Sequence, residues 1–323
     1  MKSFWGRYLE IDLSRQEYRA IPLEDKVFQE YLGGAGLAVW LLVRYAPAGC
    51  DPLGEENPLI FASSPLLGTM APASGKYAVA TKSPLTGFIG DSISSGSWAL
   101  ELKRAGYDAL VVRGIAPDWQ YLFIQEGEVH FRDAAALRGL TSPQVDAAIR
   151  KELADMEVRV VSTGLGGENL VRYAGLTNDD GRQAGRTGTG AVMGAKKLKA
   201  IAVRGSQEIA VADPVHFEAL SQEIFIQAQG PLTEKYRVLG TTSNLLVLNR
   251  LGVLPTRNFQ QGTFEGASAI SGEELGRRFL GEVAACLACP IGCDHRYLVP
   301  EEAGKEAAQV GMDYQTLYAL GPA

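Results

Sequence analysis

Residues 178–194 read NDDGRQAGRTGTGAVMG, and three lysines and the apolar run Ile201–Val203 follow them. This glycine- and arginine-rich stretch closes a long N-terminal part that consists of short β-type runs separated by Gly and Pro. The character of the chain changes after the loop Gly205-Ser206-Gln207, where helical spacing prevails. We therefore expect two domains, residues 1–205 and residues 206–323.

Strand-type runs and helical periods alternate before Gly205. Tyr8–Leu13 and Glu17–Ile21 flank Ser14-Arg15-Gln16 and predict a hairpin. Further strands are predicted at Leu59–Ala62, Tyr77–Thr81, Ala109–Arg113, Tyr121–Gln125, Val158–Val161 and Ile201–Val203. Helices are predicted at Val27–Leu32, Ala38–Tyr45, Trp98–Ala105 and Pro143–Leu153. The first domain is thus expected to be β-rich within an α+β fold.

The second part carries signals for helix starts. Asp213-Pro214 is typical of an N-cap followed by proline at the first helical position. Ser271–Glu274 is a capping box that predicts a helix running through Leu280. We expect this part to be the start of a mainly helical domain.

Composition and charge exclude several classes of protein. The chain has 323 residues, with 31 Lys+Arg against 37 Asp+Glu and a formal charge of −6, which argues against a nucleic-acid partner. Met1–Glu10 has no apolar signal-peptide core. The uncharged run Asn57–Gly75 is broken by three prolines, so it predicts a buried strand and loop and no membrane helix. Clustered cysteines suit a metal better than disulfides, which favours a cytoplasmic location.

The cysteine loop is Cys286-Leu-Ala-Cys289-Pro-Ile-Gly-Cys293. Two intervening residues let two thiolates reach one metal centre, and the Pro-Ile-Gly turn can bring in the third. An iron–sulfur cluster would need a fourth ligand from elsewhere. His295 would instead complete a Cys₃His zinc site. A redox or merely buried thiol group is the third alternative.

Two segments could bind phosphate. Residues 178–194 combine exposed amides at an expected helix start with nearby cations. The third glycine of this stretch is misplaced for a dinucleotide-binding fingerprint, and the residues before it predict a polar loop. The alternative is that its glycines only allow close backbone packing. Ser92–Trp98 opens the predicted helix that runs to Ala105 and offers a second cradle, although a Ser-rich N-cap needs no ligand.

Conventional catalytic residues are scarce. The three histidines, His130, His216 and His295, are far apart in the sequence. Any redox chemistry is therefore expected to reside in a cofactor.

Several motifs together resemble the aldehyde:ferredoxin oxidoreductases, over the whole chain in one register. They are Trp5–Leu13, Tyr31–Ala38, Ala80–Gly87, Glu101–Asp108, Gly167–Leu170, Gly190–Val203 and the cysteine loop. The resemblance implies a first domain of two β-sheets beneath a tungsten or molybdenum bis-pyranopterin, with helical domains after it. It also implies a 4Fe-4S cluster held by Cys286, Cys289 and Cys293, a small aldehyde as substrate, ferredoxin as electron acceptor, and a possible homodimer.

The resemblance also implies roles for residues of both cradles. A Mg²⁺ that bridges the pterin phosphates would be held partly by the carbonyls of Ile93 and Gln183. Arg182 would add a cation, and Lys76 stands where the family often has Arg. The full set of candidate cofactor-binding residues is Lys76, Ile93, Ser94, Ser95, Gly96, Arg182, Gln183, Gly185 and Arg186.

Two departures from the family pattern concern the C-terminal end of the sequence. Gln315 occupies the place of a family Glu that is a candidate proton acceptor, so the catalytic residue is left open. The family continues for a comparable length beyond residue 323 and supplies its fourth cluster cysteine there. We expect the chain to be an N-terminal fragment that is inactive alone, with Leu317, Tyr318 and Leu320 left uncovered. The alternative function is a non-catalytic scaffold of the same family, stabilised by iron–sulfur or zinc.

Overall fold

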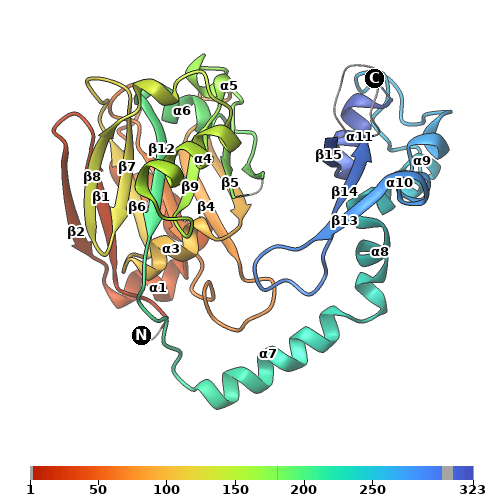
Figure 1. Ribbon diagram of the computed structural model, residues 1–323, viewed down its shortest axis with the longest axis horizontal. Coiled ribbons are helices and arrows are strands. Elements are labelled where there is room, and N and C mark those ends of the chain that lie inside the picture. Colours follow the sequence, from red (N-terminus) through yellow and green to blue (C-terminus); the bar gives the residue numbers. More distant parts are fainter. Residues whose placement is uncertain (1–2, 180, 300–307, 323) are drawn as a thin grey trace. The chain divides into compact units, whose positions relative to one another are not determined.

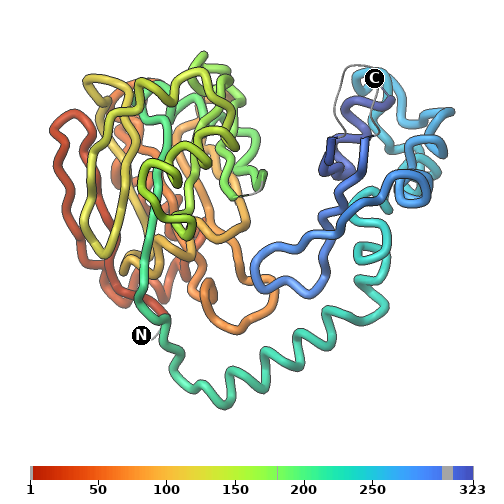
Figure 2. The backbone as a smooth tube through the Cα atoms, viewed as in Figure 1, coloured from red at the N-terminus to blue at the C-terminus, as the bar shows by residue number. Residues whose placement is uncertain are grey.

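Two six-stranded sheets form the framework of the first part of the chain (Figure 1). The computed structural model describes residues 3–179, 181–299 and 308–322. Contacts divide the chain into two compact units, Met1–Phe217 and Glu218–Ala323, and Figure 2 follows the backbone through both. The predicted α+β class, with a two-sheet first part and helices after it, is confirmed.

The first sheet has the strand order β2-β1-β6-β3-β4-β5. Only β1 and β6 run parallel. The predicted N-terminal hairpin is its β1–β2 pair, with Leu9 opposite Ala20. The strands are β1 (Arg7–Asp12), β2 (Glu17–Pro22), β3 (Leu59–Ser63), β4 (Lys76–Lys82), β5 (Ile89–Ser95) and β6 (Ala109–Arg113).

The second sheet has the order β11-β10-β9-β12-β7-β8, in which only β12 and β7 run parallel. Strand β5 is an edge strand of the first sheet, and β11 is an edge strand of the second. Each of them belongs in part to one of the two segments that were predicted to bind phosphate. The strands are β7 (Gln120–Gln125), β8 (Glu128–Asp133), β9 (Arg159–Thr163), β10 (Leu176–Asn178), β11 (Arg182–Ala184) and β12 (Leu198–Arg204).

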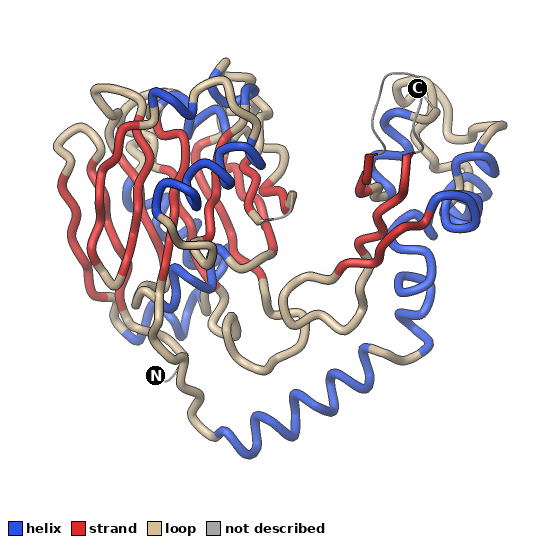
Figure 3. Tube along the Cα trace, viewed as in Figure 1, coloured by secondary structure: helices blue, strands red, loops and turns tan. Residues whose placement is uncertain are grey.

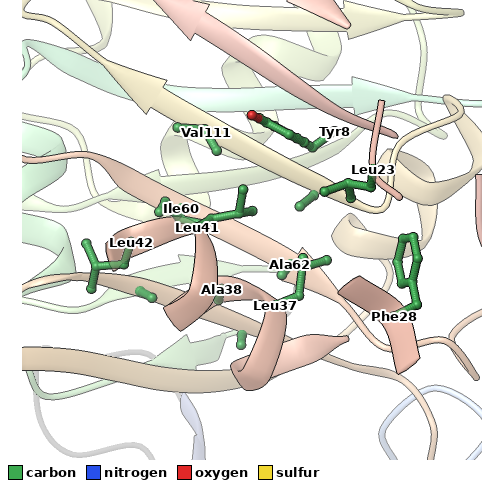
Figure 4. Packing of buried hydrophobic residues seen from close by; sticks show 13 residues of the cluster. Tyr8, Leu23, Phe28, Leu37, Ala38, Leu41, Leu42, Ile60, Ala62 and Val111 are labelled. Carbon is green, nitrogen blue, oxygen red and sulfur yellow. The ribbon is translucent and has the colours of Figure 1, made fainter. Parts of the chain in front are cut away.

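Helices bury one face of each sheet. Leu37 and Leu41 of α2 pack with Ile60 of β3 in the core of the first sheet (Figure 4). Val145 and Ile149 of α4 pack against the second sheet in the same way. The helices of this unit are α1 (Asp25–Tyr31), α2 (Gly34–Tyr45), α3 (Trp98–Arg104), α4 (Ser142–Leu153), α5 (Leu165–Glu168) and α6 (Thr189–Ala195), with a 3₁₀ turn at Ala135–Leu137.

Trp98 joins the two sheets through α3. Its ring lies 4.9 Å from that of Phe61 on β3 and 5.2 Å from that of Tyr77 on β4, measured between centroids. Its indole nitrogen donates a hydrogen bond of 2.8 Å to the carbonyl of Ile201 on β12. Apolar contact and a satisfied N–H thus fix the helix between both sheets.

The predicted helix Trp98–Ala105 is confirmed as α3, but two expectations for nearby segments were wrong. Ser92–Ser95 forms the end of β5, and only Ser97 stands at the N-cap of α3. The antiparallel β4–β5 ladder, which pairs Tyr77 with Ser94, overrides the preference of serine for helix caps. Arg182–Ala184, expected as a polar loop, forms β11 because it pairs with β10.

The second unit is mainly helical, with one small antiparallel sheet in the order β13-β14-β15 (Figure 3). The Asp213 cap is confirmed, since its Oδ1 accepts the amide of His216 at 3.1 Å. Ser271 caps α10, but that helix ends at Phe279 and Leu280 begins β13. The elements from residue 214 on are α7 (Pro214–Ala228), α8 (Pro231–Leu239), α9 (Leu245–Arg250), α10 (Gly272–Phe279), β13 (Leu280–Ala284), β14 (Asp294–Val299), β15 (Ala308–Gly311) and α11 (Tyr314–Leu320), with 3₁₀ turns at Gly240–Asn244 and Ala267–Ile270.

A small core holds this unit together. Leu317 packs with Leu245, Leu254 and Ala267, so the expectation that it lies uncovered was wrong. Leu320, one helical turn on, is 76% exposed as expected. No helix among the described residues has both the length and the apolar character needed to cross a bilayer.

Asp108 anchors the N-terminal segment of the first unit. Its Oδ2 accepts the backbone amides of Trp5 at 2.9 Å and Gly6 at 2.8 Å. Burial raises the pKa of this carboxyl from 3.8 to about 6, against the opposing effect of nearby Lys103. Burial likewise lowers the pKa of Lys103 to about 8.

This anchor predicts a pH dependence of stability. The pKa of the Asp108 carboxyl is higher in the folded than in the unfolded state. The contribution of Asp108 to the free energy of unfolding is therefore full below the unfolded pKa and is lost as pH rises through about 6. We predict that the unfolding free energy of wild type minus that of Asp108→Asn falls by up to about 3 kcal/mol over this window. The Asn side chain keeps an acceptor for both amides, and urea unfolding at stepped pH measures the difference. A difference that does not change with pH would contradict the prediction.

Candidate cofactor site and cysteine loop

The two predicted cradle segments meet at the sheet edges. Strand β5 contacts β11, and the Ser92 hydroxyl donates a 2.7 Å hydrogen bond to the carbonyl of Gly185. A cavity of about 440 Å³ opens beside this contact, and Ile93, Gly185 and Arg186 are among its lining residues. We name the residues Ile93–Gly96 and Arg182–Arg186 the edge site.

The side chains of the edge site face in different directions. Ile93 is 58% exposed although apolar, and Gln183 and Arg186 are exposed too. Ser94 and Ser95 are buried, and exposed Lys76 lies opposite Ser95 in the β4–β5 register. The exposed members can therefore contact a bound group, whereas the two serines face the protein interior.

Asn178 and Asp179 support the edge site from β10 and the turn after it. The Asn178 Oδ1 accepts hydrogen bonds from the hydroxyls of Tyr77 and Ser94, each at 2.8 Å. The Asp179 carboxylate accepts the amide of Ser97. Both residues lie in the glycine-rich stretch, but no local pattern predicts their role, because Tyr77, Ser94 and Ser97 lie 82 or more residues away.

The glycines of residues 178–194 serve two purposes. A Cβ at Gly190 would lie 2.2 Å from the Gly175 carbonyl oxygen, and one at Gly194 would lie 2.0 Å from that of Gly167. These two glycines therefore allow close backbone packing. At the start of α6 the Gly190 amide is not available to a ligand, because it donates to the Ala174 carbonyl at 2.8 Å. Gly185 differs, because no atom lies within 4 Å of its Cβ position.

The edge site fits an anionic, polar ligand. Arg182 and Arg186 bring two cations, and Gly185 leaves room for close approach to the backbone. Two buried oxygens, Asp179 Oδ1 and Thr187 Oγ1, have no hydrogen-bond partner among the described residues. Buried polar atoms are usually satisfied, and Thr187 lines the cavity, so its hydroxyl can bond a polar group there. The Asp179 carboxylate oxygen would instead accept from a cation or a hydrogen-bond donor.

The cysteine loop connects β13 to β14 in the second unit. The Cys289 amide donates to the Cys286 carbonyl at 3.0 Å, and Ala288 and Gly292 adopt left-handed backbone conformations that fold the loop tightly. All three thiols are half-buried. Burial, followed by the nearby Cys286 and Cys289, raises the pKa of the Cys293 thiol. The thiols are thus gathered in one tight loop.

The zinc alternative requires His295 as a fourth ligand beside the three thiols. His295 is only 1% exposed, and its Nε2 lies 3.1 Å from the Arg237 carbonyl oxygen, which occupies that nitrogen. In the part of the chain that the structure describes, no three His, Cys, Asp or Glu side chains are arranged to hold a single metal ion. In a 4Fe-4S cluster each cysteine thiolate binds a different iron, so the thiolate sulfurs do not converge on a single metal ion.

Gln315 lies in the same unit as the cysteine loop. It is exposed in the first turn of α11, which Asp313 precedes as N-cap. The Asp313 Oδ1 accepts the Thr241 hydroxyl at 2.9 Å, and its charge contributes to the raised pKa of Cys293. The start of α11 is therefore near the cysteine loop.

Comparison with known proteins identifies the class. Residues 8–205 match the family model for the N-terminal domain of aldehyde ferredoxin oxidoreductase, and residues 219–323 match that for its domains 2 and 3. The protein is thus of the oxidoreductase class. It belongs to the aldehyde ferredoxin oxidoreductase family, as its motifs predicted.

Named relatives extend this finding. The tungsten-containing aldehyde ferredoxin oxidoreductase of Thermococcus kodakarensis is 41% identical over 98% of this chain and 52% of its own length. The WOR-like subunit of an aliphatic sulfonate oxidoreductase from Pyrococcus furiosus is 30% identical over 91% of this chain and 49% of its own. The active-site complex BamBC of benzoyl coenzyme A reductase has a chain with a TM-score of 0.82 at 30% identity, covering 99% of this chain and 50% of that one. This chain spans about half the length of the relatives it matches.

Proposed function

We propose that the protein oxidises an aldehyde to a carboxylic acid at a tungsten or molybdenum bis-pyranopterin centre. The observation that carries the proposal is the meeting of β5 and β11, which brings Ile93 and the Gly185-Arg186 turn to one cavity. The tungsten-containing relative at 41% identity supports tungsten over molybdenum. In the overall reaction water supplies the added oxygen, and two electrons and two protons leave.

The edge site would hold the cofactor through its phosphates. Arg182 and Arg186 would neutralise their charge, and Gly185 would let the backbone approach closely. The carbonyls of Ile93 and Gln183 would bind the Mg²⁺ between the phosphates, since Mg²⁺ prefers oxygen ligands. Lys76 would add a cation beside Ser95. When bound, the metal centre supplies the two-electron redox chemistry.

The cysteine loop would hold a 4Fe-4S cluster through Cys286, Cys289 and Cys293. The fourth ligand would come from outside the loop, because a 4Fe-4S cluster takes four ligands and the loop supplies three thiolates. Electrons would leave one at a time to ferredoxin. The three thiols require a reducing compartment, which favours the cytoplasm. We also propose that two copies of the chain assemble as a homodimer.

The proposal is tested by analysing protein expressed anaerobically with tungstate or molybdate. We expect tungsten or molybdenum, pterin, iron and acid-labile sulfide together with aldehyde-dependent dye reduction in the full gene product. Residues 1–323 alone should show little metal and no sustained turnover. Full gene product with iron but neither pterin nor tungsten or molybdenum would favour the non-catalytic scaffold. Near-stoichiometric metal and sustained turnover in residues 1–323 would instead show that this part suffices.

Gln315→Glu should change the pH dependence of turnover. The swap is nearly isosteric at an exposed position, so folding should persist. It adds a carboxylate that accepts a proton at neutral pH, which the amide does not do. Gln260→Glu, exposed in the same unit, serves as the matched control. Superimposable pH–rate profiles of wild type and Gln315→Glu would remove Gln315 from the proton path.

A further inference from the structure

Asn178 links the two sheets through hydrogen bonds on both atoms of its amide. Oδ1 accepts from Tyr77 on β4 and from Ser94 on β5, and burial raises the pKa of Tyr77, which keeps that hydroxyl a donor. Nδ2 donates to the Ser95 carbonyl at 2.8 Å and to Asp179 Oδ2 at 3.0 Å. The residue is only 1% exposed, so each of these bonds replaces a lost contact with water.

The bonds of Asn178 fall where the edge site is built. Its partners Ser94 and Ser95 directly follow Ile93 in β5. Strand β11 begins at Arg182, four residues after Asn178. Asp179 extends the connection to the Ser97 amide, just past Gly96. The amide therefore sets the position of β5 relative to the strand pair β10–β11, which no backbone ladder joins to β5.

We propose that Asn178 is a positioning residue for the cofactor site, which holds β5 and β11 at the spacing that a pterin phosphate and its cation require. This inference rests on the proposed function. Asn178 touches no bound group itself and acts through Ser94, Ser95 and Asp179. Partners behind a metal or cofactor site fix its geometry, and their loss typically weakens binding about tenfold to a hundredfold.

The test compares Asn178→Asp with Asn57→Asp in the full gene product. Asn178→Asp turns Nδ2 into an oxygen that faces the Ser95 carbonyl and Asp179, so two attractive contacts become repulsive. Asn57 is an equally buried control, whose Nδ2 donates to the carbonyls of Pro52 and Lys82, neither of which belongs to β5 or β11. Pterin and tungsten or molybdenum per folded protein are measured after anaerobic purification, and thermal unfolding is recorded for each variant.

We expect both variants to unfold at lower temperature, and only Asn178→Asp to lose cofactor, by about tenfold. Tyr77→Phe removes a single donor to Asn178 Oδ1 and provides a milder second variant should Asn178→Asp not fold; it should lose cofactor by a smaller factor. If cofactor content falls with unfolding temperature in the same way in all variants, Asn57→Asp included, the inference is overturned. The proposed function would remain intact. Wild type without pterin would overturn the proposed function itself.

Discussion

Gly96→Val should abolish cofactor loading and destabilise the first unit. Gly96 has a φ of +120°, which side-chain-bearing residues rarely adopt, and an added Cβ would lie 2.0 Å from Asp179 Oδ2 and 2.6 Å from Asn178 Nδ2. Relief requires the turn after β10 to move away from β5, which separates the two strands of the edge site. The strain and the lost bonds together should cost about 3–5 kcal/mol of unfolding free energy. Urea unfolding and pterin content measure the two effects.

Gly139→Val separates backbone strain from the steric clash. Gly139 has a φ of +77°, and no atom lies within 4 Å of its Cβ position. This variant should lose about 1–3 kcal/mol from strain and retain its cofactor. Iron content should remain normal in both variants, because the cysteine loop lies in the second unit. Equal pterin recovery from Gly96→Val and Gly139→Val would show that the contact between Gly96 and Asp179 has no part in cofactor binding.

Cys289→Ser should remove the iron–sulfur cluster. Cys289 is the middle thiol of the loop, and its amide closes the turn with the Cys286 carbonyl. Serine preserves the size and the amide but lacks a thiolate, so only two thiolates would remain in the loop. Iron and acid-labile sulfide should fall at least about tenfold. Colorimetric iron and sulfide analyses of anaerobically purified protein measure the loss.

Cys50→Ser is the matched control for this loss. Cys50 is buried in the first unit, whereas the cysteine loop belongs to the second, so Cys50→Ser should keep wild-type iron and sulfide. Wild type that contains zinc without acid-labile sulfide would favour the Cys₃His alternative. Unchanged iron and sulfide in Cys289→Ser would exclude the loop from cluster binding altogether.

Elements with strong local signals were predictable from the sequence. The β1–β2 hairpin, α2 and α4 carry apolar residues at the spacing of their element, and each buries that face. The Asp213 and Ser271 caps rest on contacts within three residues. Strand β5 was missed because its buried positions are glycine and serine and its exposed ones include isoleucine, the reverse of an ordinary strand at a sheet edge. Only pairing with β4 makes it a strand.

The sequence by itself determined the family, the order of the main elements and the cysteine loop, because these depend on residues close together in the chain. The tertiary structure alone decided which glycines pack and which leave space, and that Ser92 and Gly185 meet although 93 residues separate them. It also decided the role of Asn178, whose partner Tyr77 is 101 residues away. Hydrogen bonds over such separations depend on how two sheets are brought together, which no local pattern of residues specifies.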